Sequence, residues 1–364
     1  MDYTRRDIGK LALAALTTGG FLAKQNSIFA DAPAKPNSRF AGVYIGINAP
    51  ITFHGTASTA DEIIAGMKKL GLSACELRLQ PVEGFIRGTG ASPVPGGRGR
   101  GGPGGPGGPG GRGAADAGGA AGQRGAADAR GGAGRGRAPL TPEQEAAQKA
   151  AAEDLRKWRL SLSTDVFKTF RKKYSDAGIL ISVLKVDNID TFADDVVDYS
   201  FNVAKLLGAK AMSTEIPLSA SKRIGQFADK HKMLVGYHGH TNVTDPEAFA
   251  SPQSWETAMS YAKYNGWNLD IGHFVAANSI SPVPFLQKYH DRITHLHLKD
   301  RKKNMGANLA WGRGDTPIVE CLQLIRDKKW NIPGIIEMEH PTPAGSDNWI
   351  ELAKCIEFCK KALL

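Results

Sequence analysis

Short apolar runs alternate with amphipathic stretches along most of this chain. A short apolar run favours a buried strand, and apolar residues three and four apart favour a helix. The eight predicted strands are residues 40–48, 74–79, 179–184, 209–216, 234–240, 267–273, 293–300 and 334–340.

Helices are predicted between these strands. The first has apolar residues at helical spacing from Ile63 to Leu70, Ser58 or Thr59 as its N-cap, and Gly71 at its end. The others are residues 141–174, 192–207, 221–231, 255–264, 283–289, 318–328 and 349–363.

Eight strand–helix units predict a single (β/α)₈ barrel over residues 39–364. Such barrels need about 250 residues, and this range supplies enough even after an insertion is left out. The alternative is a doubly wound open sheet, which usually carries a glycine-rich nucleotide-binding turn after the first strand. The segment Gly46-Ile-Asn-Ala-Pro50 is not such a turn.

Residues 88–138 interrupt the pattern after the second predicted strand. They hold 22 of the 43 glycines, together with Gly-Gly-Pro repeats and Ala/Arg/Gly runs. A segment of this composition cannot bury enough apolar surface to offset the entropy of ordering it. We therefore predict a disordered insertion that acts as a solvated tether.

Half of the net charge of +10 comes from the same insertion, which has seven Arg and two Asp. The remainder is only mildly basic, so no nucleic-acid partner is predicted. The four cysteines, Cys75, Cys321, Cys355 and Cys359, form no CxxC motif and are predicted to be buried free thiols.

The N-terminal residues 1–32 have the order of an export signal. Arg5-Arg6 precedes a modest apolar run from Leu11 to Ala23, and Ala30-Asp31-Ala32 offers a cleavage site. This order resembles a twin-arginine signal, which predicts a periplasmic or exported protein in a bacterium. The run is too short and too rich in Gly and Thr to predict a stable membrane span.

Polar side chains stand at the ends of the last four predicted strands. They are His238 and His240, Asp270 and His273, His297 and Lys299, and Glu337 and Glu339. All strand ends of such a barrel open on one mouth, so these side chains are expected to converge. Burying His, Asp and Glu without partners is costly, and a coordinated divalent cation would remove that cost. The pattern therefore predicts a metal site.

Asp270, His297 and Glu337 form the centre of the predicted site. Alternate side chains of a strand share a face, so spacing does not separate His238 from His240. One is expected to ligate and the other to orient substrate, and we assign the fourth ligand position to His240.

For three glutamates and one histidine of the predicted strands, the sequence allows more than one role. Glu76 and Glu215 end the second and fourth strands, where they either face the mouth, as supporting or substrate contacts, or lie on the surface. Glu339 shares a face with Glu337, and the choice between these two as ligand stays open. His295 is expected to be a hydrogen-bonded core residue.

Five short motifs resemble the sugar phosphate isomerase/epimerase superfamily, whose barrel is xylose-isomerase-like. They are Tyr237-His238-Gly-His240, Asp270-Ile-Gly-His273, His297-Leu-Lys299-Asp300, Trp311-Gly-Arg-Gly314 and Glu337-Met-Glu339. The resemblance implies that a divalent ion is bound through residues at the ends of strands five to eight. It also shows one departure, because epimerases of the family usually have Glu on strand five, where this chain has His238 or His240.

The resemblance implies a sugar isomerase or epimerase that removes a proton next to a carbonyl. Either Glu337 or Glu339 would be one base, and either His238 or His240 the other. His273 would hydrogen-bond the hydroxyl that gains charge, and Lys299 would supply a further cation. Substrate contacts would come from Glu76, Glu215 and Trp311.

The mixed His and carboxylate ligand set favours Mn²⁺, with Zn²⁺, Co²⁺, Mg²⁺ and Fe²⁺ as alternatives. No glycine-rich phosphate cradle is present, so a free sugar, a keto-sugar or a glycoside is the expected substrate. A homodimer is compatible with these features.

Two other functions remain open on the sequence alone. Proton abstraction next to a ketone can also expel a leaving group, so a lyase or hydrolase of keto-glycosides would use the same site. The second function that remains open is that of an exported sugar-binding protein with an inactive site. A DNA-repair endonuclease on this barrel is disfavoured, because the strand ends offer too few ligands for three zinc ions.

Overall fold

A computed structural model describes residues 35–89 and 141–364 of this protein. The predicted export signal, residues 1–32, lies outside the described residues, as does the predicted insertion except for Gly88 and Thr89. The chain divides into a unit of residues 1–92 and 159–364 and a smaller unit of residues 93–158. All of the strands that the structure describes belong to the larger unit.

Eight parallel strands close into a barrel, which confirms the predicted fold class. Each strand pairs with the next along the chain, and the last pairs with the first. The strands are β2 (Val43–Ala49), β3 (Ala74–Arg78), β4 (Leu180–Lys185), β5 (Ala211–Thr214), β6 (Val235–His238), β7 (Asn265–Asp270), β8 (Ile293–Leu298) and β9 (Gly334–Ile336). A short strand, β1 (Arg39–Phe40), pairs antiparallel with β2.

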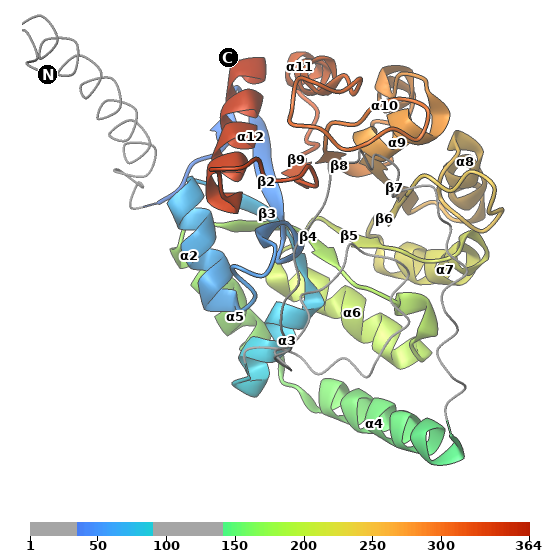
Figure 1. Cartoon of the computed structure of the whole chain (residues 1–364). Helices are drawn as coiled ribbons and strands as arrows, with labels where there is room; N and C mark the ends of the chain where they lie inside the picture. Colours follow the sequence, from blue (N-terminus) through green and yellow to red (C-terminus); the bar gives the residue numbers. More distant parts are fainter. Residues whose placement is uncertain (1–34, 90–140) are drawn as a thin grey trace, which may run out of the picture. The chain divides into compact units, whose positions relative to one another are not determined.

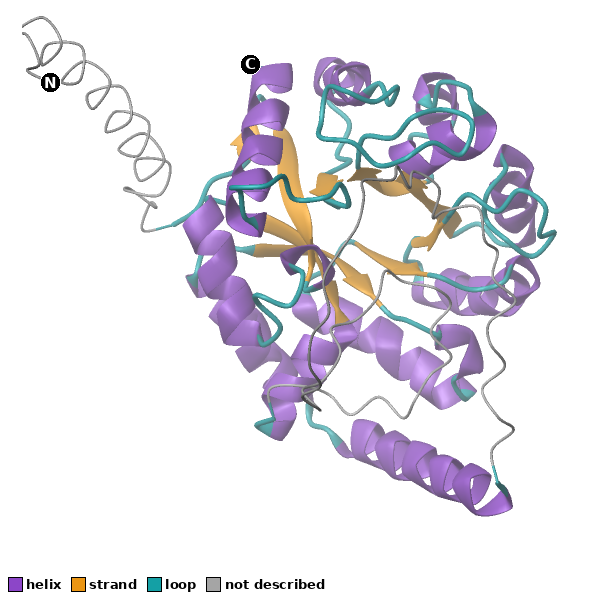
Figure 2. Cartoon of the chain, viewed as in Figure 1, coloured by secondary structure: helices purple, strands orange, loops and turns teal. Residues whose placement is uncertain are grey.

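Helices surround the barrel, as Figures 1 and 2 show. They are α2 (Ala60–Leu70), α3 (Leu79–Arg87), α5 (Thr164–Asp176), α6 (Asp194–Leu207), α7 (Ser221–His231), α8 (Pro252–Tyr261), α9 (Ile271–Asn278), α10 (Val283–Lys288), α11 (Ile318–Lys328) and α12 (Asn348–Leu363). Three 3₁₀ turns, η1 (Ile51–Phe53), η2 (Ile189–Thr191) and η3 (Leu218–Ala220), lie in the loops.

Local sequence signals account for the ends of α2. Thr59 is the N-cap, because its side chain accepts from the Glu62 N–H while the Glu62 carboxylate accepts from the Thr59 N–H. Gly71 ends the helix with a φ of 71°, a backbone region that favours glycine. The apolar face of the helix, including Ile63 and Met67, is buried in the core.

Three features differ from the sequence prediction. The helix predicted over residues 141–174 is two helices, α4 (Pro142–Ser161) and α5, because Ser163 takes an extended conformation as the N-cap of α5. The helix α3 starts directly after β3, within residues predicted as strand and loop. The helix α9 begins at Ile271, within the predicted strand 267–273, because the Asp270 side chain caps it.

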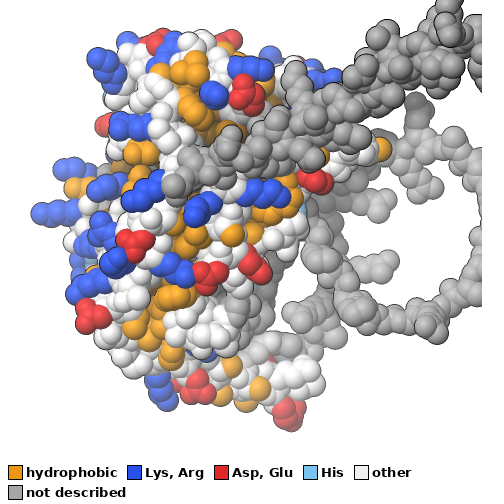
Figure 3. All heavy atoms as spheres, turned by 90° about the vertical axis from the view of Figure 1, so that its left-hand side faces the viewer, with side chains coloured by type: hydrophobic (Ala, Val, Ile, Leu, Met, Phe, Trp, Pro, Cys, Tyr) orange, Lys and Arg blue, Asp and Glu red, His pale blue; other side chains and the backbone are white. Residues whose placement is uncertain are grey.

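The surface in Figure 3 carries charges of both signs among apolar side chains. One pair joins two helices, where Lys173 on α5 contacts Asp61 on α2. All four cysteines are free and buried, as predicted. Within the two described ranges, none of the helices combines the length and the apolar character that a membrane crossing requires.

A buried ion pair fixes the chain where it rejoins the barrel. The guanidinium of Arg159, in the last turns of α4, donates to the Glu83 carboxylate of α3 at 2.7 and 3.1 Å. The side chains are 9% and 1% exposed, so neither charge is well solvated. The hydroxyl of Tyr199 on α6 lies 3.4 Å from the same carboxylate.

Replacing Arg159 by Met is expected to destabilise the protein by about 3–5 kcal/mol, because it removes the guanidinium that contacts the buried Glu83 carboxylate. Urea unfolding followed by circular dichroism measures this loss. The double variant Arg159→Met with Glu83→Leu is the matched control and should recover most of the stability. A loss below about 1 kcal/mol in the single variant would contradict the assignment.

Candidate metal centre

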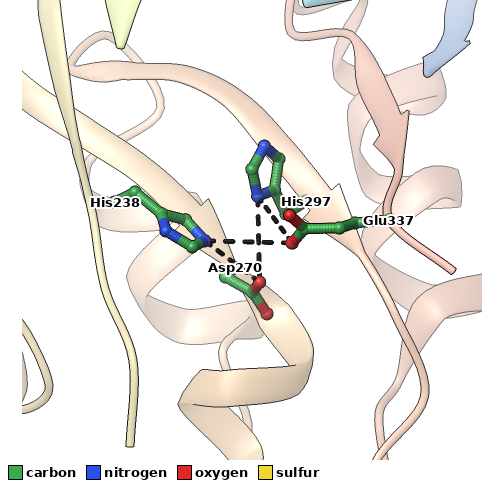
Figure 4. A group of neighbouring side chains, drawn as sticks. All are labelled: His238, Asp270, His297 and Glu337. Carbon is green, nitrogen blue, oxygen red and sulfur yellow. Dashed lines mark hydrogen bonds and ion pairs between the residues drawn. The ribbon is translucent and has the colours of Figure 1, made fainter. Parts of the chain in front are cut away.

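Four buried side chains converge at one side of the barrel mouth. His238 ends β6, Asp270 ends β7, His297 lies on β8 and Glu337 directly follows β9. One ligand atom of each lies within 4.8 Å of the others. Figure 4 shows the four side chains pointing toward a common centre.

Four distances define this group. The Nδ1 atom of His297 lies 3.0 Å from Oε2 of Glu337 and 3.8 Å from Oδ2 of Asp270. The Nε2 atom of His238 lies 3.3 Å from Oδ2 of Asp270 and 3.9 Å from Oε2 of Glu337. Two imidazole nitrogens and two carboxylate oxygens therefore face one another across a small buried space.

The second oxygen of each carboxylate is held by the scaffold. Oδ1 of Asp270 accepts from the His273 N–H at the start of α9, at 2.7 Å. Oε1 of Glu337 accepts from the amide of Asn48, which is near the end of β2, at 2.9 Å. Each carboxylate therefore keeps one fixed oxygen and presents the other to the group.

These donors fit a divalent ion. Nδ1 of His297 and Oε2 of Glu337 are buried and make no well-directed hydrogen bond with the described residues, although they lie 3.0 Å apart and the Lys299 ammonium lies 2.8 Å from the carboxylate oxygen. A ligand set of two imidazoles and two carboxylates suits Mn²⁺, Zn²⁺, Co²⁺ or Fe²⁺ better than Ca²⁺. The group could therefore hold a metal ion, which supports the predicted cofactor class.

A carboxylate stands behind His238. Its Nδ1 lies 3.1 Å from Oε1 of Glu215, which follows β5. Glu215 also pairs with Lys185, a buried residue at the end of β4. A carboxylate in this position fixes the orientation of a ligating imidazole and makes it a stronger donor.

A second carboxylate stands behind His297. The Nε2 atom of His297 lies 2.7 Å from Oε2 of Glu76 on β3. The other oxygen of Glu76 lies 3.3 Å from Nε2 of His295, and Nδ1 of His295 lies 2.9 Å from the Thr294 hydroxyl. Glu76, His295 and His297 are all fully buried. Glu76 thus holds His297 from inside the barrel, as Glu215 holds His238 at its mouth.

The structure brings His238, rather than His240, into the four-residue group. The side chain of His240 is 51% exposed, and its Nε2 lies 3.3 Å from Oε2 of Glu215. The strand β6 ends at His238, so His240 lies two residues further on, in the loop that follows the strand. His240 as a ligand stays a prediction, and this geometry instead favours His238.

Lys299 lies among the carboxylates. Its ammonium is 3.0 Å from Oδ2 of Asp270, 2.8 Å from Oε2 of Glu337 and 3.0 Å from Oε2 of Glu339. It also lies 3.0 Å from Nε2 of His273 on α9. Glu339 is partly exposed and stands outside the four-residue group.

Trp311 lies in the loop between β8 and α11. Its ring meets Phe358 of α12 edge-on at 5.8 Å between centroids. Asp300 shapes this loop, because its carboxylate accepts from the N–H groups of Gly312 and Gly314, each at 2.8 Å. A substrate contact by Trp311 stays a prediction.

Sequence reasoning missed several residues of this neighbourhood. Asn48 and Lys185 lie at the ends of β2 and β4, and the strand-end rule that selected the other candidates also applies to them. Asn308, whose amide donates to Glu339 at 3.2 Å, lies in a loop without such a signal. Arg301 contacts Nδ1 of His273 at 2.8 Å.

The group shifts the pKa values of its own members. Burial would raise the pKa of Glu337, but His297 and Lys299 hold it well below its usual range. Burial lowers the pKa of His297, but Glu337 and Glu76 outweigh this effect and raise it to about 10. His273 shifts the other way, because burial lowers its pKa well below the usual value. Without an ion, His297 is therefore protonated at neutral pH.

No family profile and no curated relative matches this chain. A xylose isomerase domain protein from Alicyclobacillus acidocaldarius is 12% identical, with 88% of this chain and 98% of the other covered and a TM-score of 0.54.

Two sugar epimerases have the same fold. The 3-keto-D-glucoside 4-epimerase of E. coli is 8% identical, with coverage of 88% and 99% and a TM-score of 0.52. The D-psicose 3-epimerase of Clostridium cellulolyticum H10 is 12% identical, with coverage of 88% and 99% and a TM-score of 0.51. At these identities the likeness establishes a shared barrel, and the chemistry must be argued from the site.

Binding of a divalent ion at neutral pH is expected to release about one proton, because His297 must lose its proton to ligate. Its pKa of about 10 means that the affinity should rise with pH, by about tenfold per unit between pH 6 and 8. Isothermal titration with Mn²⁺ in two buffers of different protonation enthalpy measures the release. Equal heats in both buffers would contradict the prediction.

Proposed function

We propose that this protein is a divalent-metal-dependent sugar isomerase or epimerase that acts next to a carbonyl group. The observation that carries the proposal is the buried group of His238, Asp270, His297 and Glu337 at the mouth of a barrel. The sugar epimerases with the same fold make this reaction class the first to test. Mn²⁺ is the first metal to test, followed by Zn²⁺, Co²⁺, Mg²⁺ and Fe²⁺.

When bound, the ion would supply the positive charge that stabilises the negative charge developing on the sugar oxygen. The residues of the chain have the remaining tasks of binding the sugar, orienting it and moving the proton. His238 and Glu337 belong to the four-residue group that would hold the ion. Of the two histidines, His240 is then left for proton transfer, and of the two glutamates, Glu339. This choice reverses the sequence assignment of His240 as the fourth ligand, and it selects Glu339 as the base from the pair of glutamates that the sequence left open.

Glu339 is our candidate for the base on the β9 side. Its side chain is 24% exposed, so it can reach a sugar in the mouth, and Lys299 and Asn308 fix its Oε2. His240 is our candidate for the base on the β6 side, because its exposed ring lies near those of His238 and His273, at 4.8 and 5.1 Å between centroids. The carboxylate of Glu215 orients it.

The charges around the mouth favour an uncharged sugar, keto-sugar or glycoside. Lys185 pairs with Glu215, Arg78 pairs with Asp187, and Lys299 contacts three carboxylates. Paired charges of both signs suit hydroxyl groups, which donate and accept, better than a phosphate, which requires a surplus of cations. Export through the twin-arginine pathway is part of the proposal and agrees with a free sugar as substrate.

The deciding experiment is metal analysis of the purified protein followed by a screen of sugars and keto-glycosides. We expect about one divalent ion per chain, turnover that is lost on chelation, and recovery of an isomeric sugar. Release of an aglycone from a 3-keto-glycoside would instead identify a lyase or hydrolase on the same site. Protein with neither bound metal nor metal-dependent turnover would contradict the proposal.

Glu337→Gln separates an enzyme from an exported sugar-binding protein. In an enzyme of the proposed kind, this change removes one ligand, so metal content and turnover both fall. A binding protein with an inactive site would keep its sugar affinity, and its metal content would be unchanged. Sugar binding is measured by titration calorimetry on both forms.

Glu339→Gln, assayed at saturating metal, is expected to lower kcat about 10²- to 10⁴-fold, because it removes a general base. KM should change little, since Gln keeps the size and the hydrogen bonding of the side chain. Asn308→Ala is the matched control, because it removes only a neighbour of Glu339 and should cost much less. A kcat within about threefold of the parent would exclude Glu339 as a base.

A further inference from the structure

Lys299 contacts the two oxygen atoms that the metal site would share. Its fully buried ammonium lies 3.0 Å from Oδ2 of Asp270 and 2.8 Å from Oε2 of Glu337. These same atoms face His238 and His297 across the four-residue group. The ammonium and a divalent ion would therefore draw on the same negative charge.

The strength of this competition follows from burial. Both carboxylates are nearly inaccessible, with side chains 1% and 7% exposed, so water screens their charges weakly. In such surroundings, two cations a few ångströms apart repel each other much more strongly than they do at a surface. Lys299 should thus stabilise the carboxylates when no ion is present and oppose an ion that approaches them.

A third carboxylate gives the ammonium another partner. Oε2 of Glu339 lies 3.0 Å from Nζ of Lys299 and is outside the ligand group. The amide of Asn308 donates to the same oxygen at 3.2 Å and holds it in place. The ammonium can therefore keep one carboxylate contact while the other two carboxylates bind an ion.

We propose that Lys299 is a built-in counterion that stabilises the metal-free protein and lowers the affinity of the site for its divalent ion. The inference rests on the metal centre of the proposed function and adds a residue that sets its affinity. Lys299 is a positioning residue in this role, because it acts through the ligand carboxylates. The metal would be held loosely enough to exchange with ions in solution.

A different role would predict the opposite sign. If Lys299 served only to clamp the two carboxylates in their ligating positions, its removal would disorder them and weaken metal binding. The direction of the change in metal affinity therefore distinguishes a competing counterion from a structural clamp.

The test is Lys299→Met in the full chain, titrated with Mn²⁺ by calorimetry and heated with and without Mn²⁺. Met fills a similar volume without charge. We expect the Kd for Mn²⁺ to fall at least about tenfold, because a competing cation is removed. The melting temperature of the metal-free variant should drop, because two buried carboxylates lose their cation, and the shift on adding Mn²⁺ should exceed that of the parent.

Two controls isolate the effect of position. Lys302→Met removes a half-exposed charge that pairs with Asp315, and it should leave the Kd within about twofold. Lys185→Met removes an equally buried ammonium that contacts Glu215, the carboxylate beside His238, and it should not tighten Mn²⁺ binding as Lys299→Met does. If Lys299→Met does not fold, Lys299→Gln is measured in its place, with the same expected direction.

The outcomes separate this inference from the proposed function. A parent that binds Mn²⁺ and a Lys299 variant that binds no more tightly would overturn the counterion role alone. A parent that binds no Mn²⁺ and a variant that does would support the counterion role and overturn the metal enzyme. Failure of both to bind would overturn both proposals.

Discussion

Burying charged side chains inside a barrel is possible only if each charge finds a partner, and this requirement organises the whole mouth of the protein. Glu76, Lys185 and Lys299 are fully inaccessible, yet each contacts at least one group of opposite charge or a histidine. Removing any one partner would leave a charge in a medium that solvates it poorly. The residues therefore act as one network, and the four-residue group lies at its centre.

Within this network, each side chain of the four-residue group contacts the scaffold with one polar atom and faces the group with the other. The carboxylates of Asp270 and Glu337 each give one oxygen to the scaffold and the other to the group. The imidazoles of His238 and His297 each have one nitrogen beside a supporting carboxylate and the other toward the group. Four donors are thereby oriented before any ion arrives, which is what a metal site requires of the protein.

Much of the fold could be predicted because its signals are local. The helix α7 has the predicted limits, and the capping residues of α2 mark both its ends. The helix α9 was missed because its N-cap is Asp270, a residue that the pattern marked as a ligand. One oxygen of this side chain caps the helix while the other faces the four-residue group, and sequence spacing cannot reveal this.

The sequence by itself determined the barrel and the strand ends that carry the chemistry, because hydrophobic periodicity and residue type are local properties. Only the tertiary structure brought His238, rather than His240, into the four-residue group, since alternation fixes the face of a strand but not the residue at which the strand ends. It also placed Glu76 behind His297, 221 residues away along the chain, and the ammonium of Lys299 on the ligand oxygens. Those contacts depend on how strands far apart in sequence are aligned around the barrel, as Asp270 is beside His297, and no single segment encodes that alignment.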